Sequence, residues 1–287
     1  MEISGKTRLL GLFGTPVGHS KSPAMYNYCF RKFNLDWAYL AFDVPLEKTS
    51  DAIQSFRTLN MVGANVTMPL KKAVIPYLDE LTPAASAIQA VNTIVNRDGK
   101  LIGNNTDGCG YTRNLESHGI SVRGKKIVLM GGGGAASAIA VQAALEGAKE
   151  IDVFNIKDAF YEKLENTLAS IRKVACKCQL SLHDLDDREL LEKTIEEADI
   201  LSNATRVGMA PHEEESNIKD LSWFRKDLIV TDVVYNPSET KMLRDAKKVG
   251  CRTCDGLGML LYQGAEAFKL YSGLDMPVEE IRNLLYK

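Results

Sequence analysis

Short apolar runs alternate with amphipathic, helix-forming stretches along most of the chain. Strands are short apolar segments and surface helices carry a periodic apolar stripe, so the pattern separates the two. In chain order, the first third predicts a strand at 8–13, a helix at 23–33, a strand at 38–44, a helix at 46–59 and a strand at 61–66. Such alternation predicts an α/β fold with mostly parallel sheets.

The next stretch has two local signals. Residues 91–103 predict a β-hairpin, because the turn dipeptide Asp98-Gly99 divides two apolar runs. Residues 107–119 predict a helix that ends at Gly119, a residue suited to the left-handed conformation of a C-cap. We expect this helix to lead into a second domain.

The alternation becomes regular after residue 125. Apolar runs predict strands at 127–130, 151–155, 176–182, 199–204, 228–235 and 251–256. Six strands with helices between them fit a doubly wound sheet. The C-terminal stretches at 257–273 and 278–287 are predicted to be helical.

The glycine run from Gly131 to Gly134 lies between the first of these strands and a stretch of small, helix-forming residues. Read as G-x-G-x-x-A, Gly131, Gly133 and Ala136 match a dinucleotide-binding turn. The first glycine permits the tight turn, the second exposes backbone to the pyrophosphate, and the third, small residue lets the helix pack closely. The alternative is a glycine-rich surface turn. About 125 residues precede the run, enough for a separate substrate domain.

Composition narrows the functional classes. The 287 residues suggest about two domains, and 45% apolar with 25% charged residues is typical of a soluble globular protein. A net charge of −2 gives no basic field for nucleic acid or an anionic membrane. No apolar run approaches the roughly 18 residues of a membrane span, and the first residues lack a signal-peptide core. We therefore expect a cytoplasmic protein.

Cysteine spacing could suggest zinc at two places. Cys176 and Cys178 form a C-x-C pair, and Cys251 and Cys254 form a C-x-x-C pair. No His-x-x-x-His or matching second pair accompanies them, so strand segments with reduced thiols are the better interpretation. We expect no metal site.

Three polar strings interrupt the apolar pattern at ends of predicted strands, where open α/β sheets place their ligands. The first is GHSKSP at 18–23, in which the hydroxyls of Ser20 and Ser22 could bind an anion near a helix N-terminus. The alternative is N-capping by Ser22, with Pro23 as the first helical residue. The two roles are compatible.

The second string is NVTMPLKK at 65–72. Asn65 and Thr67 alternate to the same side of an apolar strand, and Lys71 opens the following helix. A lysine at the end of a strand facing a cofactor cleft is a candidate acid/base, because desolvation lowers the pKa of an ammonium group. The alternative is a solvated lysine like its neighbour Lys72.

The third string is NNTDG at 104–108. Asp107 could cap a helix that begins at Gly108. If it lies near Lys71, the two form a coupled acid/base pair, because a carboxylate stabilises the ammonium form.

These strings together resemble the shikimate dehydrogenase family. GHSKSP, NVTMPLK, AVNTIV and NTDG occur in this order and are followed by GGGGAA, SNAT, VGMAP, VVYNP and GLGMLLYQGAEAF. The resemblance covers essentially the whole chain. VGMAP, the chain length and the region of Asp158 look most like the quinate/shikimate dehydrogenase subgroup.

The resemblance implies an N-terminal α/β substrate domain at 1–106 and a doubly wound Rossmann domain at 107–255. C-terminal helices at 256–287 would return to the substrate domain. It implies an NAD(P)-dependent oxidoreductase that interconverts shikimate and 3-dehydroshikimate, and also quinate and 3-dehydroquinate. Such an enzyme serves aromatic amino-acid biosynthesis or quinate utilisation. Its partner is a cyclic polyhydroxy acid, and the protein would be a monomer or homodimer.

The resemblance also implies residue roles. Lys71 and Asp107 would be the catalytic pair, with Lys71 taking the hydroxyl proton as hydride leaves for the nicotinamide. Ser20 and Ser22 would bind the substrate carboxylate. The other substrate-binding residues would be Asn65, Thr67, Asn92, Gln263 and Tyr235. The cofactor-binding residues would be Gly131, Gly132, Gly133, Gly134, Ala135, Asn155, Lys157, Asp158, Thr205, Val233 and Gly256. We expect a cleft that closes between the two domains, because hydride transfer requires close carbons and excluded water.

The chain departs from the family pattern at the cofactor ribose. Members that use NADP commonly carry Asn-Arg-Thr after the second Rossmann strand, whereas this chain has Asn155, Ile156, Lys157 and Asp158. Asp158 could accept hydrogen bonds from a ribose diol and would repel a 2′-phosphate. Lys157 favours the phosphate. We therefore expect NAD to be preferred, with some use of NADP.

A second departure is Gln89, where the family usually has glycine. Glycine adopts backbone angles closed to glutamine, so we expect a different local turn. Two other functions share the general design: a methylenetetrahydrofolate dehydrogenase, whose catalytic lysine motif differs from NVTMPLK, and a ligand sensor that binds the cyclic acid without turnover. The presence of Lys71, Asp107 and the glycine run argues against a sensor.

Overall fold

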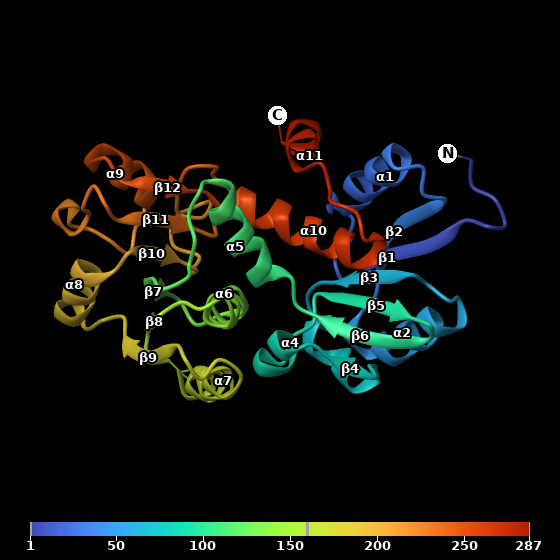
Figure 1. Cartoon of the computed structure of the whole chain (residues 1–287), viewed down its shortest axis with the longest axis horizontal. Helices are drawn as coiled ribbons and strands as arrows, with labels where there is room; N and C mark the ends of the chain where they lie inside the picture. Colours follow the sequence, from blue (N-terminus) through green and yellow to red (C-terminus); the bar gives the residue numbers. More distant parts are fainter. Residues whose placement is uncertain (1, 159–160, 287) are drawn as a thin grey trace. The chain divides into compact units, whose positions relative to one another are not determined.

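The computed structural model describes residues 2–158 and 161–286 (Figure 1). The chain forms two compact units. The first consists of the segment up to Thr106 together with the segment from Gln263 onward, and the second is Asp107–Tyr262. The boundary therefore falls inside a helix, whereas the predicted domain boundary lies at 255/256. The predicted helix at 278–287 includes Lys287, which lies outside the described residues.

The first unit is built on a six-stranded sheet of order β2-β1-β3-β5-β6-β4. Its elements are β1 (Arg8–Gly14), α1 (Ser22–Lys32), β2 (Trp37–Asp43), α2 (Thr49–Thr58), β3 (Gly63–Val66), α3 (Leu70–Ala73), β4 (Glu80–Leu81), α4 (Pro83–Ile88), β5 (Thr93–Arg97), β6 (Lys100–Asn104) and α11 (Val278–Leu285), with short 3-10 turns at Leu46–Lys48 and Ile75–Tyr77. Strand β1 pairs in parallel with both β2 and β3. The hairpin of β5 and β6 joins antiparallel to β3 and turns at Asp98 and Gly99, as predicted.

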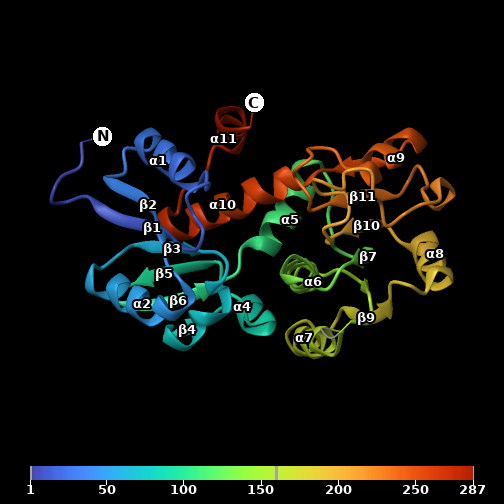
Figure 2. The ribbon, with the colours of Figure 1, turned by 180° about the vertical axis from the view of Figure 1, so that it is seen from behind.

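The second unit is a doubly wound sheet of order β12-β11-β10-β7-β8-β9 in which each neighbouring pair is parallel. Its elements are α5 (Asp107–Ser117), β7 (Lys126–Met130), α6 (Gly134–Leu145), β8 (Glu150–Asn155), α7 (Tyr161–Val174), β9 (Gln179–Asp184), α8 (Arg188–Glu197), β10 (Ile200–Asn203), a 3-10 turn (Leu221–Trp223), β11 (Ile229–Asp232), α9 (Lys241–Val249) and β12 (Arg252–Cys254). Helices α6 and α7 lie on one face and α8 and α9 on the other (Figures 1 and 2). The predicted α/β fold with a Rossmann-type sheet is confirmed.

The C-terminal segment packs on the first unit, as predicted. Helix α10 (Gly256–Ser272) crosses the boundary between the units, and the Tyr26 hydroxyl of α1 donates to the Gly264 carbonyl oxygen at 3.1 Å. Helix α11 is held to α1 by Glu280, which pairs with Lys32 at 2.7 Å. These contacts explain why the last 25 residues belong to the first unit rather than extending the second.

Two predicted helix starts are wrong in detail. Helix α1 begins at Ser22 and its N-cap is Lys21, so Ser22 does not cap it. The Ser22 backbone N–H donates to the Ser20 hydroxyl oxygen at 3.2 Å. The Ser22 hydroxyl does not cap the helix. Helix α5 begins at Asp107 rather than at Gly108.

Gln89 adopts backbone angles that glycine favours. Gln89 ends α4 in the left-handed conformation (φ 51°, ψ 46°), which is the conformation that favours glycine. Its Nε2 donates to the Ser86 carbonyl oxygen at 2.7 Å. The chain therefore keeps a glycine-type turn and accepts backbone strain, part of which this hydrogen bond offsets.

We predict that Gln89→Gly raises the free energy of unfolding by up to about 1 kcal/mol, because relief of the left-handed strain exceeds the lost exposed hydrogen bond. Gln89→Ala keeps the strain and loses the bond, so it should lower the free energy of unfolding by roughly 0.5–1 kcal/mol. Urea unfolding of the three proteins measures both values. An alanine variant as stable as the glycine variant would contradict the assignment of strain.

Candidate active site

In the first unit, the segment with Ser20 and Ser22 follows β1 and the segment with Thr67 follows β3. Both segments therefore start at the carboxyl ends of neighbouring parallel strands. Strands β1 and β3 are parallel neighbours, and the Thr67 backbone N–H donates to the Phe13 carbonyl oxygen at 2.9 Å. A Cβ atom added to Gly14 would lie 2.3 Å from the Thr67 methyl group. Glycine is therefore required where the loop that carries Ser20 and Ser22 starts against the segment that carries Thr67.

Two buried asparagines lie beside these loops. Asn65 is 6% exposed and Asn92 is 3% exposed. The Tyr39 hydroxyl donates to Asn65 Oδ1 at 2.8 Å, and Asn65 Nδ2 lies 3.3 Å from the Thr93 hydroxyl. Burial raises the pKa of Tyr39 well above its ordinary value, so its phenol stays a donor. These contacts fix which end of the Asn65 amide is donor and which is acceptor.

Hydrogen bonds also fix the orientation of the Asn92 side-chain amide. Its Oδ1 accepts from the Thr106 backbone N–H at 2.8 Å, and its Nδ2 lies 3.0 Å from the Thr106 hydroxyl oxygen and 3.5 Å from Gln263 Oε1. The structure thus brings together three of the predicted substrate residues: Asn65, Asn92 and Gln263. Sequence reasoning missed Thr93 and Thr106, although Thr106 lies inside the NNTDG string.

Lys71 lies next to this polar row. Its side chain is half-buried on α3, whereas that of Lys72 is exposed. The Val91 backbone N–H donates to the Lys71 carbonyl oxygen at 2.8 Å, and the Val66 backbone N–H donates to the Asn92 carbonyl oxygen at 2.7 Å. These two bonds place the backbones of Lys71 and Asn92 side by side. The difference in exposure between the two lysines favours Lys71 as the functional one.

In the second unit, the glycine run fits the diphosphate of a dinucleotide. Helix α6 begins at Gly134 with Gly133 as its N-cap, and no side chain caps it. A Cβ atom added to Gly133 or Gly134 would meet nothing within 4 Å, so bare backbone faces open space there. Gly131 has φ +117°, and a Cβ atom on it would lie 2.8 Å from the Ala204 carbonyl oxygen. A helix N-terminus with exposed amides is suited to an anionic diphosphate.

The end of β8 carries the residues predicted at the cofactor ribose. Asn155 Nδ2 donates to the Ile156 carbonyl oxygen at 2.9 Å, and Ile156, Lys157 and Asp158 are exposed. Lys157 pairs with Asp184 at 3.3 Å. A hydrogen bond from the Asp186 backbone N–H is the main cause that lowers the pKa of Asp184 below its ordinary value, and Lys157 lowers it further. The Lys157 ammonium, which would favour a 2′-phosphate, is thus partly neutralised by the Asp184 carboxylate.

The remaining predicted residues of the second unit lie on its loops and at helix starts. Thr205 lies two residues after the end of β10, Val233 directly follows β11, and both are half-buried. Tyr235 is 52% exposed. A Cβ atom on Gly256 would lie 2.3 Å from the Val233 carbonyl oxygen, so α10 starts directly against this loop. Asp107 is the first residue of α5 and is half-buried.

A small cavity on the second unit contains none of the predicted site residues. It lies between α8 and the β7–β9 surface, and its charged groups largely pair with one another. Lys126 contacts Glu197 at 2.9 Å and Glu150 at 3.6 Å, and His183 lies 2.8 Å from Asp152. We therefore do not assign a ligand to it.

Within residues 2–158 and 161–286, no three His, Cys, Asp or Glu side chains are grouped so as to hold a metal ion. Among the helices of the same ranges, none combines the length and apolar character needed to cross a bilayer.

Comparison with known proteins gives a consistent result. Residues 12–94 match the shikimate dehydrogenase substrate-binding domain, and residues 256–286 match the shikimate 5′-dehydrogenase C-terminal domain. The chain is 50% identical to the shikimate dehydrogenase (NADP(+)) of Streptococcus uberis over 99% of this chain and 97% of that protein.

Solved structures agree with these matches. The shikimate 5-dehydrogenase of Listeria monocytogenes in complex with shikimate and NAD is 47% identical, with a TM-score of 0.96 over 100% of this chain and 99% of that one. The quinate dehydrogenase of Corynebacterium glutamicum in complex with NAD is 30% identical, with a TM-score of 0.85 over 96% and 98% of the two chains.

We predict that Gly133→Val weakens binding of the reduced dinucleotide at least about tenfold while the melting temperature of the free protein stays unchanged. A Cβ atom at Gly133 would meet no atom of a non-neighbouring residue within 4 Å. In the proposed binding mode it would project toward the diphosphate. Fluorescence titration measures the dissociation constant. Gly5→Val is the matched control, because a Cβ atom there also meets nothing within 4 Å. Equal dinucleotide affinities for the two variants would refute the assignment.

Proposed function

Because this chain belongs to the shikimate dehydrogenase family, we propose that it is an NAD(P)-dependent oxidoreductase that interconverts shikimate and 3-dehydroshikimate. The observation that carries the proposal is the buried amide row of Asn65 and Asn92 beside Lys71. A polyhydroxylated ring is distinguished from its analogues by polar groups held in fixed orientations. The likeness to a structure that contains shikimate and NAD supports the same substrate class.

Lys71 is the proposed proton acceptor. In the oxidation direction its amine takes the proton from the ring hydroxyl while the hydrogen on the same carbon leaves with its electron pair as hydride. In the reduction direction its ammonium stabilises the developing alkoxide and returns the proton. A bound nicotinamide supplies the hydride acceptor or donor. Asp107 is the proposed carboxylate of the catalytic pair, since a carboxylate favours the ammonium form.

The other polar residues have proposed binding roles. Ser20 and Ser22 bind the substrate carboxylate through the loop after β1. The ring hydroxyls are bound by Asn65, Thr67, Asn92, Asp107 and Gln263, with Tyr235 near the nicotinamide. The fixed amides of Asn65 and Asn92 support this assignment, because a preoriented amide binds a hydroxyl at little ordering cost.

For the cofactor we infer a preference for NAD, with NADP also used. Ile156 supplies no charge where NADP-using members of the family commonly have arginine, and Asp158 would repel a 2′-phosphate. Lys157, which could attract the phosphate, is paired with Asp184. The Listeria monocytogenes structure contains NAD, whereas the Streptococcus uberis relative is named for NADP(+). The Gly131–Gly134 turn would hold either dinucleotide.

We also propose quinate as a second substrate, supported by the likeness to the quinate dehydrogenase of Corynebacterium glutamicum. The enzyme would then serve aromatic amino-acid biosynthesis or quinate utilisation. A cytoplasmic location and a monomeric or homodimeric state are further predictions.

We predict that Lys71→Ala lowers kcat by about three orders of magnitude, because the proton acceptor is removed. The dissociation constant for shikimate, measured by calorimetry, should change by less than about tenfold. Lys72→Ala is the matched control and should keep near wild-type kcat, since that side chain is exposed. Comparable losses in the two variants, or full activity of Lys71→Ala, would refute the assigned role.

We predict a higher kcat/KM with NAD than with NADP for the wild-type protein. Asp158→Asn should lower the ratio of kcat/KM with NAD to kcat/KM with NADP at least about threefold. The main cause should be a lower KM for NADP, because a repulsive charge is removed. Asp186→Asn removes an equal charge from an exposed position nearby and should leave the ratio unchanged. A wild-type preference for NADP would overturn the cofactor proposal.

A further inference from the structure

A buried carboxylate lies at the end of β11 in the second unit. Asp232 is 3% exposed and stands in register with Asn203, the last residue of the neighbouring strand β10, which is 2% exposed. In the described part of the chain, no lysine, arginine or histidine forms an ion pair with Asp232. Charged side chains are rarely buried without a charged partner, so this carboxylate needs an explanation.

Neutral donors surround the carboxylate. Asp232 Oδ1 accepts from Asn203 Nδ2 at 3.0 Å and from the Val234 backbone N–H at 2.9 Å. Its Oδ2 accepts from the Thr240 hydroxyl at 2.8 Å. These donors lie on β10, on the loop after β11 and at the start of α9. One side chain therefore ties three segments together.

Asn203 extends the network into the loop at 204–217. Its Oδ1 accepts from the Thr205 hydroxyl at 2.7 Å and from Asn217 Nδ2 at 3.2 Å. Its Nδ2, which donates to Asp232, also lies 3.2 Å from the Val207 carbonyl oxygen. Both ends of this loop are thus fastened to a side chain whose own orientation is set by Asp232.

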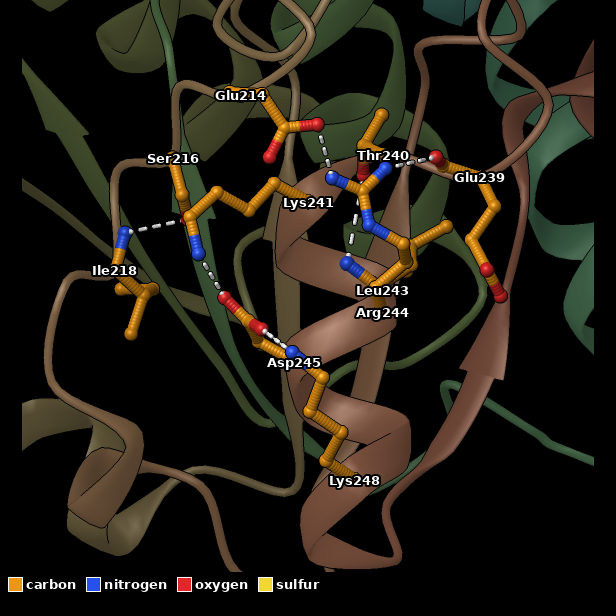
Figure 3. Close-up of polar contacts among 10 residues, drawn as sticks. All are labelled: Glu214, Ser216, Ile218, Glu239, Thr240, Lys241, Leu243, Arg244, Asp245 and Lys248. Carbon is orange, nitrogen blue, oxygen red and sulfur yellow. Dashed lines mark hydrogen bonds and ion pairs between the residues drawn. The ribbon is translucent and has the colours of Figure 1, made fainter.

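The start of α9 fastens the same loop a second time, at the surface. Thr240 is the N-cap of α9, and its hydroxyl oxygen accepts from the Leu243 backbone N–H at 3.4 Å. Arg244, one turn further along, pairs with Glu214 of the loop at 2.7 Å (Figure 3). Glu214 is 81% exposed, and exposed ion pairs contribute little. The buried contacts of Asp232 are the ones able to set loop positions.

The two loops carry residues that are predicted to bind the dinucleotide. Thr205 lies on the first loop and Val233 lies at the start of the second. The glycine turn also packs here, since a Cβ atom on Gly131 would lie 2.8 Å from the Ala204 carbonyl oxygen. A displacement of either loop would therefore move several proposed cofactor contacts together.

We propose that Asp232 is a positioning residue for the dinucleotide, which acts through Asn203 and Thr240 to hold the loops at 204–217 and 233–240 in the arrangement that receives the nicotinamide end. This inference rests on the proposed function. Asp232 contacts neither ligand in the proposal; it sets the positions of the residues that do.

The ionisation of Asp232 separates this role from a stabilising one. Burial raises its pKa from an ordinary 3.8 to about 6, and the hydrogen bonds only partly oppose that shift. Since the folded state binds this proton more tightly than the unfolded state, the contribution to stability is greatest below the ordinary pKa and is lost as pH rises through about 6. At neutral pH the charged form lowers the stability of the fold, as expected for a group retained for its contacts.

Asparagine can reproduce the contacts without the charge. Its Oδ1 can accept from Asn203 and Val234, and its Nδ2 can donate to Thr240, whose hydroxyl then acts as acceptor. Alanine removes the acceptor of the Val234 backbone N–H and of the Thr240 hydroxyl, and it leaves Asn203 Nδ2 with the Val207 carbonyl oxygen alone. We therefore expect Asp232→Ala to raise the dissociation constant for the dinucleotide at least tenfold, and Asp232→Asn to stay within about threefold of wild type.

The experiment measures dinucleotide and shikimate dissociation constants, KM and kcat for wild type and both variants. The shikimate dissociation constant should change less than about threefold in both. Arg244→Gln removes the exposed contact to the same loop and should leave all constants near wild type. If Asp232→Ala does not fold, Thr240→Val and Thr240→Ser replace the pair, with serine expected to restore affinity.

Unfolding measured against pH gives an independent readout. Between about pH 4 and 7 the wild type should lose stability relative to Asp232→Asn, because only the wild type carries the titrating carboxyl. Unchanged dinucleotide affinity in Asp232→Ala, or equal losses in the alanine and asparagine variants, would overturn the inference. A wild-type protein that fails to bind dinucleotide would instead overturn the proposed function.

Discussion

Buried polar groups at the ends of parallel strands must each find a hydrogen-bond partner, and this requirement sets the course of the loops in both units. In the first unit, Asn92 meets it by binding both the backbone and the hydroxyl of Thr106. In the second, Asn203 meets it through Thr205, Val207 and Asp232. An unsatisfied buried group costs about 1–3 kcal/mol, so neither loop can shift without a comparable loss.

The same constraint separates groups that bind ligands from groups that position them. Asn65 and Lys71 lie among the loops of the first unit, where a polyhydroxylated ring would find fixed donors and acceptors. In the second unit the proposed diphosphate site is bare backbone at Gly133 and Gly134, and buried side chains such as Asn203 hold the neighbouring loops. Specific recognition of substrate and general recognition of a diphosphate thus rest on different chemistry.

Local pattern was sufficient for much of the fold. Except for the two-residue strand β4, the apolar runs predicted the strands of both sheets within a few residues, and Asp98-Gly99 predicted its hairpin, because period and turn chemistry are local properties. The strand–turn–helix around the glycine run was predictable for the same reason. Local pattern failed at Ser22, whose expected capping contact is replaced by one to Ser20. At Gln89 local pattern did not indicate that a glutamine would adopt the left-handed conformation.

The missed residues have partners far away in the sequence. Asp232 reads as one more polar residue at a strand end, and its burial by Asn203 and Thr240 depends on the pairing of β10 with β11. The contact of Tyr39 with Asn65 likewise requires strands β2 and β3 to lie on either side of β1. The proposal that Lys71 is catalytic came from family resemblance, since spacing alone does not distinguish it from Lys72.

The proposed activity of this chain is turnover of a cyclic polyhydroxy acid, not binding alone. The most direct test is the initial rate of nicotinamide reduction by the wild-type protein with shikimate and with quinate, alongside calorimetric binding of each acid. We predict that reduced nicotinamide forms as shikimate is consumed and that the rate saturates with both substrate and dinucleotide. Tight binding of shikimate with no reduction by either NAD or NADP would contradict it and would identify a sensor built on the same fold.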